Sequence, residues 1–205
     1  MAHADQVIPA YDRIAAVWRE ERVAGSADFR ERALLDRLVL PLPGGARILD
    51  VGCGPGEPIA AYLARRGFKV VGLDGSDRML DLARQAVPQA TFLPGDMRTA
   101  DPGRPFDAIV AWDSVFHVPR ADHHGIFARF HSWLRPAGRL LMSLGGSDEG
   151  GFTSQMHGET FFYSGHKPAE ALRILASVGF RIEHWEMDDA SSRGHIAVLG
   201  VRDAA

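Results

Sequence analysis

The sequence contains one cysteine, two lysines and no long apolar run. Cys53 has no cysteine partner within the 205 residues, so no internal disulfide forms, as expected in a reducing compartment. No stretch approaches the roughly 20 apolar residues that span a bilayer, so no membrane segment is expected. The formal net charge of -3 provides no basic excess, so we expect no nucleic-acid or anionic-lipid partner.

The remaining composition is that of a soluble globular chain, with 46% hydrophobic and 24% charged residues. The length favours a single domain over residues 1–205. Residues 1–5 lack the basic region and apolar run of a secretory signal, so we expect a cytoplasmic protein. The sequence leaves open whether it is a monomer or a homodimer.

The first 42 residues have the pattern of a helical cap. Tyr11, Ile14 and Trp18 share one face of a first helix, and Leu38 with either Ala33 or Leu34 forms the apolar stripe of a second. Prolines and glycines at 41–45 then end the second helix.

Residues 46–144 alternate strands with helices, which predicts an α/β fold with a mostly parallel sheet. The expected strands are 48–51, 69–73, 91–93, 106–112 and 139–144, and the expected helices include 57–66, one capped by Ser76, and 120–134. Residues 145–167 are interpreted as a loop or hairpin insertion on the substrate side. Residues 168–205 are interpreted as a helix, 168–177, and a hairpin with strands 180–187 and 195–201.

A glycine-rich loop follows the first expected strand and reads Asp50-Val-Gly52-Cys53-Gly54-Pro-Gly56. Glycines let the chain turn sharply and let a ligand approach the backbone, and the next helix offers free N–H groups. Ligands of such sheets bind at the carboxyl ends of the strands, where this loop lies. The loop therefore predicts a binding site.

The charge of the loop favours a cationic ligand. The dinucleotide fingerprint G-x-G-x-x-G requires glycine three residues after Gly54, where this chain has Glu57. Glu57 and Asp50 would repel a pyrophosphate. A nicotinamide-dependent oxidoreductase is therefore kept only as an alternative.

Two more segments follow later strands. Asp74 ends the second strand, where a carboxylate can accept hydrogen bonds from both hydroxyls of a ribose. Asp96 can accept from an adenine amino group while Met97 covers the ring. The fourth strand ends in the segment 111–117, Ala-Trp-Asp-Ser-Val-Phe-His.

With these motifs in this order, the sequence resembles the class I S-adenosylmethionine-dependent methyltransferases, in the small-molecule branch (type 11/25-like). The resemblance covers about residues 46–144. It implies a Rossmann-like methyltransferase fold of three layers, αβα. The implied sheet has seven mostly parallel strands in the order 3-2-1-4-5-7-6, the last antiparallel. It also implies S-adenosylmethionine as cofactor and a small-molecule methyl acceptor as substrate.

The resemblance assigns roles to the loop residues. Gly52, Cys53, Gly54 and Gly56 would line the methionine part of the cofactor, with Asp50 as acidic lining. Asp74 would hold the ribose, Gly75 and Met79 would flank the adenine, and Asp96 and Met97 would recognise it. Asp113, Ser114 and His117 would close the pocket towards the substrate, and Tyr11 and Trp18 could close over the cofactor.

The chain departs from the family's nucleic-acid branches. Asp113-Ser-Val-Phe116 stands where base-amino methyltransferases often have [DN]-P-P-[YF], and the Pro-Cys of cytosine-C5 enzymes is missing. The double-glutamate loop of arginine methyltransferases is also not evident. A non-catalytic regulatory protein that binds S-adenosylmethionine remains an alternative.

A hydroxyl or ammonium acceptor needs a general base, and His117, which follows the fourth strand, is the first candidate. His195 and Glu159 are further candidates. His123 and His124 are expected to be solvated, and no metal is expected because no ligand spacing is evident. Apolar residues of the insertion, Met156 and Phe161 to Tyr163, could form a lid.

Overall fold

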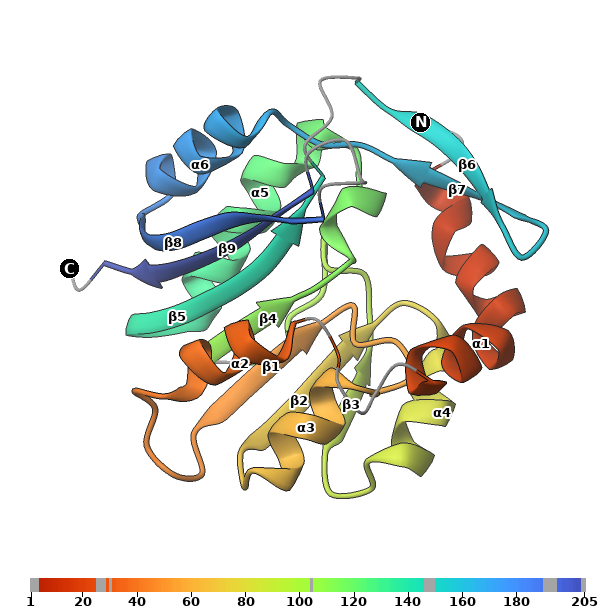
Figure 1. Ribbon diagram of the computed structural model, residues 1–205, viewed down its shortest axis with the longest axis horizontal. Coiled ribbons are helices and arrows are strands. Elements are labelled where there is room, and N and C mark those ends of the chain that lie inside the picture. The colour runs from red at the N-terminus through yellow and green to blue at the C-terminus, as the bar shows by residue number, and fades with distance from the viewer. Residues whose placement is uncertain are drawn as a thin grey trace.

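The computed structural model describes residues 4–24, 29, 31–103, 105–145, 150–189 and 195–203, and its centre is a seven-stranded sheet (Figure 1). The strands of this sheet are β1 (Arg47–Val51), β2 (Lys69–Asp74), β3 (Thr91–Pro94), β4 (Phe106–Ala111), β5 (Leu134–Leu144), β8 (Phe180–Asp189) and β9 (His195–Arg202). The α-helices are α1 (Val7–Ala24), α2 (Arg32–Val39), α3 (Ile59–Arg65), α4 (Asp77–Ala86), α5 (Arg120–Trp133) and α6 (Pro168–Ser177). Short 3-10 helices are η1 (Ala4–Gln6) and η3 (Val115–His117).

The strand order is β3-β2-β1-β4-β5-β9-β8. Neighbouring strands from β3 to β5 pair in parallel, and β9 is antiparallel to both β5 and β8. A separate hairpin, β6 (Phe152–Met156) with β7 (Glu159–Tyr163), lies within the predicted insertion. When this hairpin is left out of the count, the order is the expected 3-2-1-4-5-7-6, which is confirmed.

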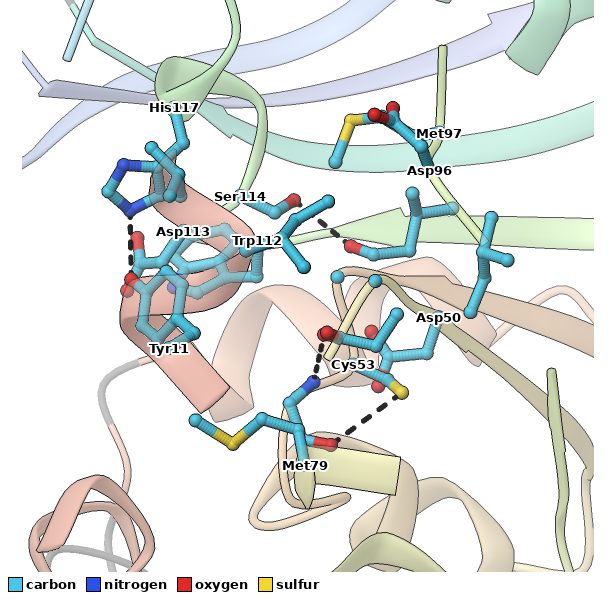
Figure 2. Close-up of a pocket in the computed structure, with 18 of the residues that line it drawn as sticks. Tyr11, Asp50, Cys53, Met79, Asp96, Met97, Trp112, Asp113, Ser114 and His117 are labelled. Atoms are coloured by element: carbon cyan, nitrogen blue, oxygen red, sulfur yellow. Dashed lines mark hydrogen bonds between the residues drawn. The ribbon is translucent and has the colours of Figure 1, made fainter. Parts of the chain in front are cut away.

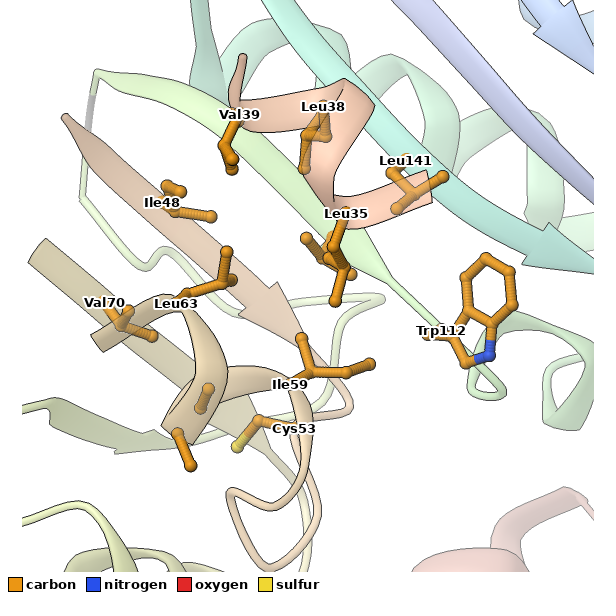
Figure 3. Packing of buried hydrophobic residues seen from close by; sticks show 14 of the residues in the cluster. Leu35, Leu38, Val39, Ile48, Cys53, Ile59, Leu63, Val70, Trp112 and Leu141 are labelled. Atoms are coloured by element: carbon orange, nitrogen blue, oxygen red, sulfur yellow. The ribbon is translucent and has the colours of Figure 1, made fainter. Parts of the chain in front are cut away.

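Helices cover both faces of the sheet because alternate strand residues point to opposite sides. Ile48 of β1 packs with α2, α3 and α4 in one apolar cluster, whereas the next residue, Leu49, packs with α5 and α6 in another. Figure 3 shows Leu35, Leu38 and Leu63 in the first cluster. Burying each such side chain contributes roughly 1.5–3 kcal/mol. The predicted three layers are therefore confirmed.

Most element boundaries differ from the expectation by one or two residues, and two of the differences concern where an element begins. Helix α3 begins at Ile59, with Pro58 as its N-cap, rather than at Glu57. Strand β5 begins at Leu134 rather than Arg139. Leu134 already pairs with Phe106 of β4, and a bulge separates this pair from the regular pairing that starts at Arg139.

The N-terminal helix positions the site. Helix α1 runs between β7 and α4, past the carboxyl ends of the central strands (Figure 1). Asp12 of α1 accepts hydrogen bonds from the Ser76 hydroxyl and the Arg78 N–H, which fastens α1 to the start of α4. Ser76 caps α4, as predicted, by accepting from the Met79 N–H at 3.2 Å. Among the described residues, no helix is long and apolar enough to cross a membrane.

Candidate functional site

The glycine loop turns sharply at the end of β1. The N–H groups of Gly52 and Cys53 both donate to the Leu73 carbonyl, at 2.7 and 3.2 Å. Gly52 has a φ of +71°, and a Cβ there would lie 2.3 Å from the Ser114 Cβ. Gly54 also has a positive φ, +52°, but a Cβ there would meet no atom within 4 Å. Gly52 is therefore required by packing and by conformation, and Gly54 by conformation.

The loop forms one wall of a pocket at the carboxyl ends of the strands (Figure 2). Helix α1 provides the opposite wall. The structure brings together in this pocket nearly all the site residues expected from the sequence: Tyr11, Trp18, Asp50, Gly52, Cys53, Gly54, Asp74, Gly75, Met79, Asp96, Met97, Asp113, Ser114 and His117.

Gly56 is not among the residues that line the pocket, and its predicted contact with the methionine part of the cofactor stays a prediction. With a φ of +79°, its Cβ position would lie 3.2 Å from Cα and Cβ of Ala83 and 3.3 Å from Val87. The glycine allows the loop to pack closely against α4. This close packing explains why a glycine stands at this position.

Asp50 is the unpaired charge of the pocket. The residue is 2% exposed, and within the described part of the chain no donor hydrogen-bonds its carboxylate. Burial raises the pKa of Asp50 to about 7, and the charge of Asp74 adds to the rise while Arg22 opposes it. A buried carboxylate without a donor is stabilised by a cation, so this wall suits a cationic group.

Asp74 is held by the loop it faces. Its Oδ2 accepts from the Gly54 N–H and its Oδ1 from the Ser76 N–H, both at 2.9 Å. Burial raises the pKa of Asp74 although these hydrogen bonds oppose the rise. The carboxylate is therefore fixed at the end of β2, where the ribose was expected.

Asp96 lines the pocket but already has a partner. Its two oxygens accept from Nε and Nη2 of Arg98 at 2.6–3.1 Å. Burial favours the protonated acid, but the Arg98 hydrogen bonds outweigh it and lower the pKa. An adenine amino group would share this carboxylate with Arg98.

His117 is buried and uses both ring nitrogens. Its Nδ1 lies 2.8 Å from the Phe162 carbonyl, so Nδ1 carries the proton and donates it. Nε2 then accepts from the Tyr11 hydroxyl at 2.8 Å (Figure 2). Burial lowers the pKa of His117 to about 4, so the ring is neutral at pH 7. The imidazole joins α1, η3 and the β7 strand.

His195 lies behind the pocket rather than in its lining. Its Nδ1 is 2.6 Å from Asp188 Oδ1 and its Nε2 is 3.2 Å from Asp113 Oδ1. Burial favours the neutral ring, but these two carboxylates outweigh it and raise the pKa to about 9. His195 is thus an imidazolium at pH 7 and has no lone pair to accept a proton.

Glu159 is also outside the pocket lining. Its oxygens accept from Nε and Nη2 of Arg13, each at 2.7 Å, and this pair lowers the pKa of Glu159. The pair joins β7 to α1 on the surface. Of the three candidate bases, the structure brings only His117 to the pocket wall.

The expectation for His123 is wrong, whereas His124 is exposed as expected. His123 is 1% exposed, its Nε2 lies 3.0 Å from the Val118 carbonyl, and burial lowers its pKa to about 4. The apolar side of α5 faces the sheet, and His123 lies on that side. Within the described ranges, no His, Cys, Asp and Glu cluster could hold a metal ion.

Two pocket arginines, Arg22 and Arg98, were not found from the sequence. Arg22 is four residues after Trp18, so it lies on the same face of α1. That spacing was a usable signal. Arg98 follows the Asp96-Met97 pair directly.

Comparison with known proteins agrees with this geometry. A family model described as a methyltransferase domain matches residues 48–138. The trans-aconitate 2-methyltransferase of Azoarcus sp. strain BH72 is 36% identical over 129 residues, which is 62% of this chain and 50% of that protein. The enzyme of the same name from Variovorax paradoxus strain S110 is 40% identical over 108 residues, 51% of this chain and 40% of that protein. The chain thus spans half or less of these curated relatives.

One solved structure matches along its whole length. A TehB-like S-adenosylmethionine-dependent methyltransferase from Corynebacterium glutamicum has a TM-score of 0.74 and 25% identity. The match covers 95% of this chain and 100% of that one. The loop, the sheet order and these matches agree, and in all three the chain is similar to the class I S-adenosylmethionine-dependent methyltransferases.

Proposed function

We propose that this protein transfers a methyl group from S-adenosylmethionine to a small-molecule acceptor. The observation that carries the proposal is the Asp50 carboxylate, which is buried against the glycine loop without a hydrogen-bond donor among the described residues. An unpaired buried carboxylate is costly unless a cation binds beside it. S-adenosylmethionine carries two cationic groups, whereas the nicotinamide cofactors bring a pyrophosphate, which Asp50 would repel.

The remaining lining also fits this cofactor. Asp74, fixed at the end of β2, can accept from the ribose hydroxyls, and Gly75 and Met79 border the space for the adenine. The open position beside Gly54 leaves room for a ligand against the backbone. We keep Tyr11, Trp18, Cys53, Met97 and Ser114 as proposed contacts because they line the same pocket.

When bound, the cofactor supplies a methyl group activated by a positive sulfur. The chain's own contribution is to hold both reactants in line and to exclude water, and such alignment is worth up to ~7–11 kcal/mol. Helix α1 performs the exclusion by lying over the pocket. Its Tyr11 hydroxyl is fixed by His117, so the wall next to the reacting atoms is ordered.

His117 is the proposed general base for an acceptor that must lose a proton. It lines the pocket, it is neutral at pH 7, and its Nε2 lone pair is occupied only by the exchangeable Tyr11 hydroxyl among the described groups. His195 is proposed instead as a positioning residue for Asp113, and Glu159 as a surface contact with α1, since both are paired outside the lining.

Small carboxylic acids are the first acceptors to test, because the matched relatives are named trans-aconitate 2-methyltransferases. We propose that residues 1–205 act as one domain in the cytoplasm, as a monomer or homodimer, without nucleic acid or metal. Size-exclusion chromatography with light scattering tests the assembly, and a larger oligomer contradicts it.

The function is tested by ligand binding followed by turnover. Calorimetry with S-adenosylhomocysteine, S-adenosylmethionine, NADH and NADPH should detect binding of only the two sulfur compounds. Release of S-adenosylhomocysteine is then measured with trans-aconitate and with amine, phenol and alcohol acceptors. Binding of a nicotinamide cofactor alone would contradict the proposal. Binding of the sulfur compounds without turnover of any acceptor would favour a regulatory protein.

A further inference from the structure

The Tyr11 hydroxyl occupies the lone pair of His117 that a general base would use. It donates to Nε2 of His117 at 2.8 Å, while Nδ1 of the same ring donates to the Phe162 carbonyl, also at 2.8 Å. Both ring nitrogens are therefore engaged, and His117 is buried. Tyr11 and His117 both line the pocket (Figure 2), so an acceptor that gives up a proton there meets the Tyr11 oxygen in place of Nε2.

The Tyr11 oxygen can still accept a hydrogen bond. Within the described part of the chain its one hydrogen bond is the one it donates to His117, and a phenolic oxygen that donates can also accept. The Tyr11 ring is held by Phe161 and Trp18, whose ring centroids lie 4.7 and 5.8 Å away. Burial raises the pKa of Tyr11, so the phenol stays protonated and accepts a proton only by passing its own to His117.

The charges of the lining disfavour an acceptor that is an anion. The acids that line the pocket are Asp50, Glu57, Asp74, Asp96 and Asp113. The arginines of the described lining are Arg22 and Arg98, and both already have a carboxylate partner. Arg98 is paired with Asp96 at 2.6 Å, and Arg22 donates to Glu31 at 2.9 Å. An acceptor with several carboxylates would be repelled by this lining, whereas a neutral acceptor would not.

We propose that Tyr11 is a catalytic residue that relays the proton of a neutral hydroxyl acceptor to His117. The inference rests on the proposed function and narrows its acceptor to a phenol or an alcohol without a carboxylate. An ionised carboxylate such as trans-aconitate has no proton to lose, so it would leave the hydrogen-bonded pair of Tyr11 and His117 without a use. The acceptor of this chain therefore differs from the one in the names of its curated relatives.

The relay conserves the charge of the pocket. The acceptor oxygen forms its bond to the methyl carbon, and the bond from that carbon to sulfur breaks with its electron pair moving to sulfur. The acceptor proton passes to the Tyr11 oxygen while the Tyr11 proton passes to Nε2 of His117. The positive charge lost at sulfur thus appears on the imidazole. Burial lowers the pKa of His117 to about 4 although Asp113 opposes the fall, so the ring releases its proton to water once the products leave.

The test removes the relaying oxygen and varies the acidity of the acceptor. Release of S-adenosylhomocysteine is measured at pH 8 with phenol and with 4-nitrophenol, which is largely ionised there. Tyr11→Phe should lower kcat about 100-fold on phenol and less than about threefold on 4-nitrophenol, because a phenolate has no proton to relay. Tyr163→Phe is the matched control. Its ring centroid lies 4.8 Å from that of His117 but it is outside the pocket lining, so it should change either kcat by less than about twofold.

A double variant and a binding measurement complete the test. Tyr11→Phe combined with His117→Gln should lower kcat on phenol no further than the more damaging single change, because the two residues act in series. Calorimetry with S-adenosylhomocysteine should show less than about a threefold change for Tyr11→Phe, which keeps the ring.

Four results would overturn the proposal: equal loss of kcat on both phenols, additive losses in the double variant, loss of S-adenosylhomocysteine affinity in Tyr11→Phe, or turnover of trans-aconitate or amines but not of phenol. If the unaltered protein binds no S-adenosylmethionine, or turns over no acceptor at all, the proposed function itself fails.

Discussion

Asp50 should make cofactor affinity depend on pH near neutrality. In the ligand-free protein its pKa is about 7, so half of the molecules hold it protonated at that pH. The ammonium of S-adenosylhomocysteine should bind only the ionised form. Each pH unit below 7 should therefore weaken binding about tenfold, reaching about 100-fold at pH 5 relative to pH 8.

The burial of Asp50 also predicts that the free energy of unfolding falls as the pH rises, whereas cofactor affinity increases. An acid whose folded pKa is raised from 3.8 to about 7 binds its proton more tightly when folded, so its contribution to stability declines from pH 4 to 7. The difference amounts to at most about 4 kcal/mol. Asp50→Asn removes this charge and should raise the Tm of the ligand-free protein at pH 8.

Calorimetry with S-adenosylhomocysteine from pH 5 to 8 checks both effects when combined with thermal unfolding. Asp50→Asn should bind weakly and show no dependence on pH in this range. If the unaltered protein has constant affinity from pH 5 to 8, or if Asp50→Asn binds as tightly, then Asp50 does not hold the cation. A lower Tm for Asp50→Asn at pH 8 would contradict the argument from burial.

Three further changes test other parts of the structure. Gly52→Ala places a Cβ 2.3 Å from the Ser114 Cβ at a positive φ, so it should lower the free energy of unfolding by about 2–5 kcal/mol. Gly54→Ala, where a Cβ meets no atom, should lower it by about 1 kcal/mol. Equal urea unfolding midpoints for the two variants would refute the packing argument. His117→Ala should lower kcat about 100-fold on an acceptor that must lose a proton, while Glu159→Gln should change kcat by no more than about twofold. The reverse order of effects would mean that Glu159 is the general base. The pKa of His195 is raised in the folded protein, so the protonated ring stabilises the fold fully below pH 6.5 and this contribution is lost towards pH 9. The free energy of unfolding should fall by about 1.4 kcal/mol per pH unit between pH 6.5 and 8.5. His195→Gln should abolish that slope.

The fold places the charges of the pocket in pairs that come from different elements. Asp113 has a φ of +50°, and its N–H donates to the Ser143 hydroxyl of β5. Its carboxylate meets His195 of β9 and lies near Arg22 of α1. These hydrogen bonds and the nearby charges outweigh burial and lower the pKa of Asp113. The end of β4 is therefore held from three sides.

The aromatic residues of the insertion pack mainly with α1. Phe161 is fully buried beside Tyr11, with ring centroids 4.7 Å apart, and Met156, Phe162 and Tyr163 belong to the same apolar cluster. Phe161, Phe162 and Tyr163 are outside the pocket lining, although the sequence suggested that they form a lid over it. They support the helix that covers the pocket.

The sequence by itself determined the fold and most of the binding site. Strand and helix periodicity are local, and the carboxyl ends of parallel strands meet at one edge, so Asp50, Asp74 and the glycine loop could be assigned to one pocket without coordinates. Only the tertiary structure decided the electrostatic state of the side chains. The sequence ranks His117 before His195 and Glu159 as candidate base only by its place after the fourth strand, because a pKa depends on burial and on partners distant along the chain. For the same reason the positioned guanidinium of Arg22 became evident only when α1, Glu31 and Asp113 were seen together.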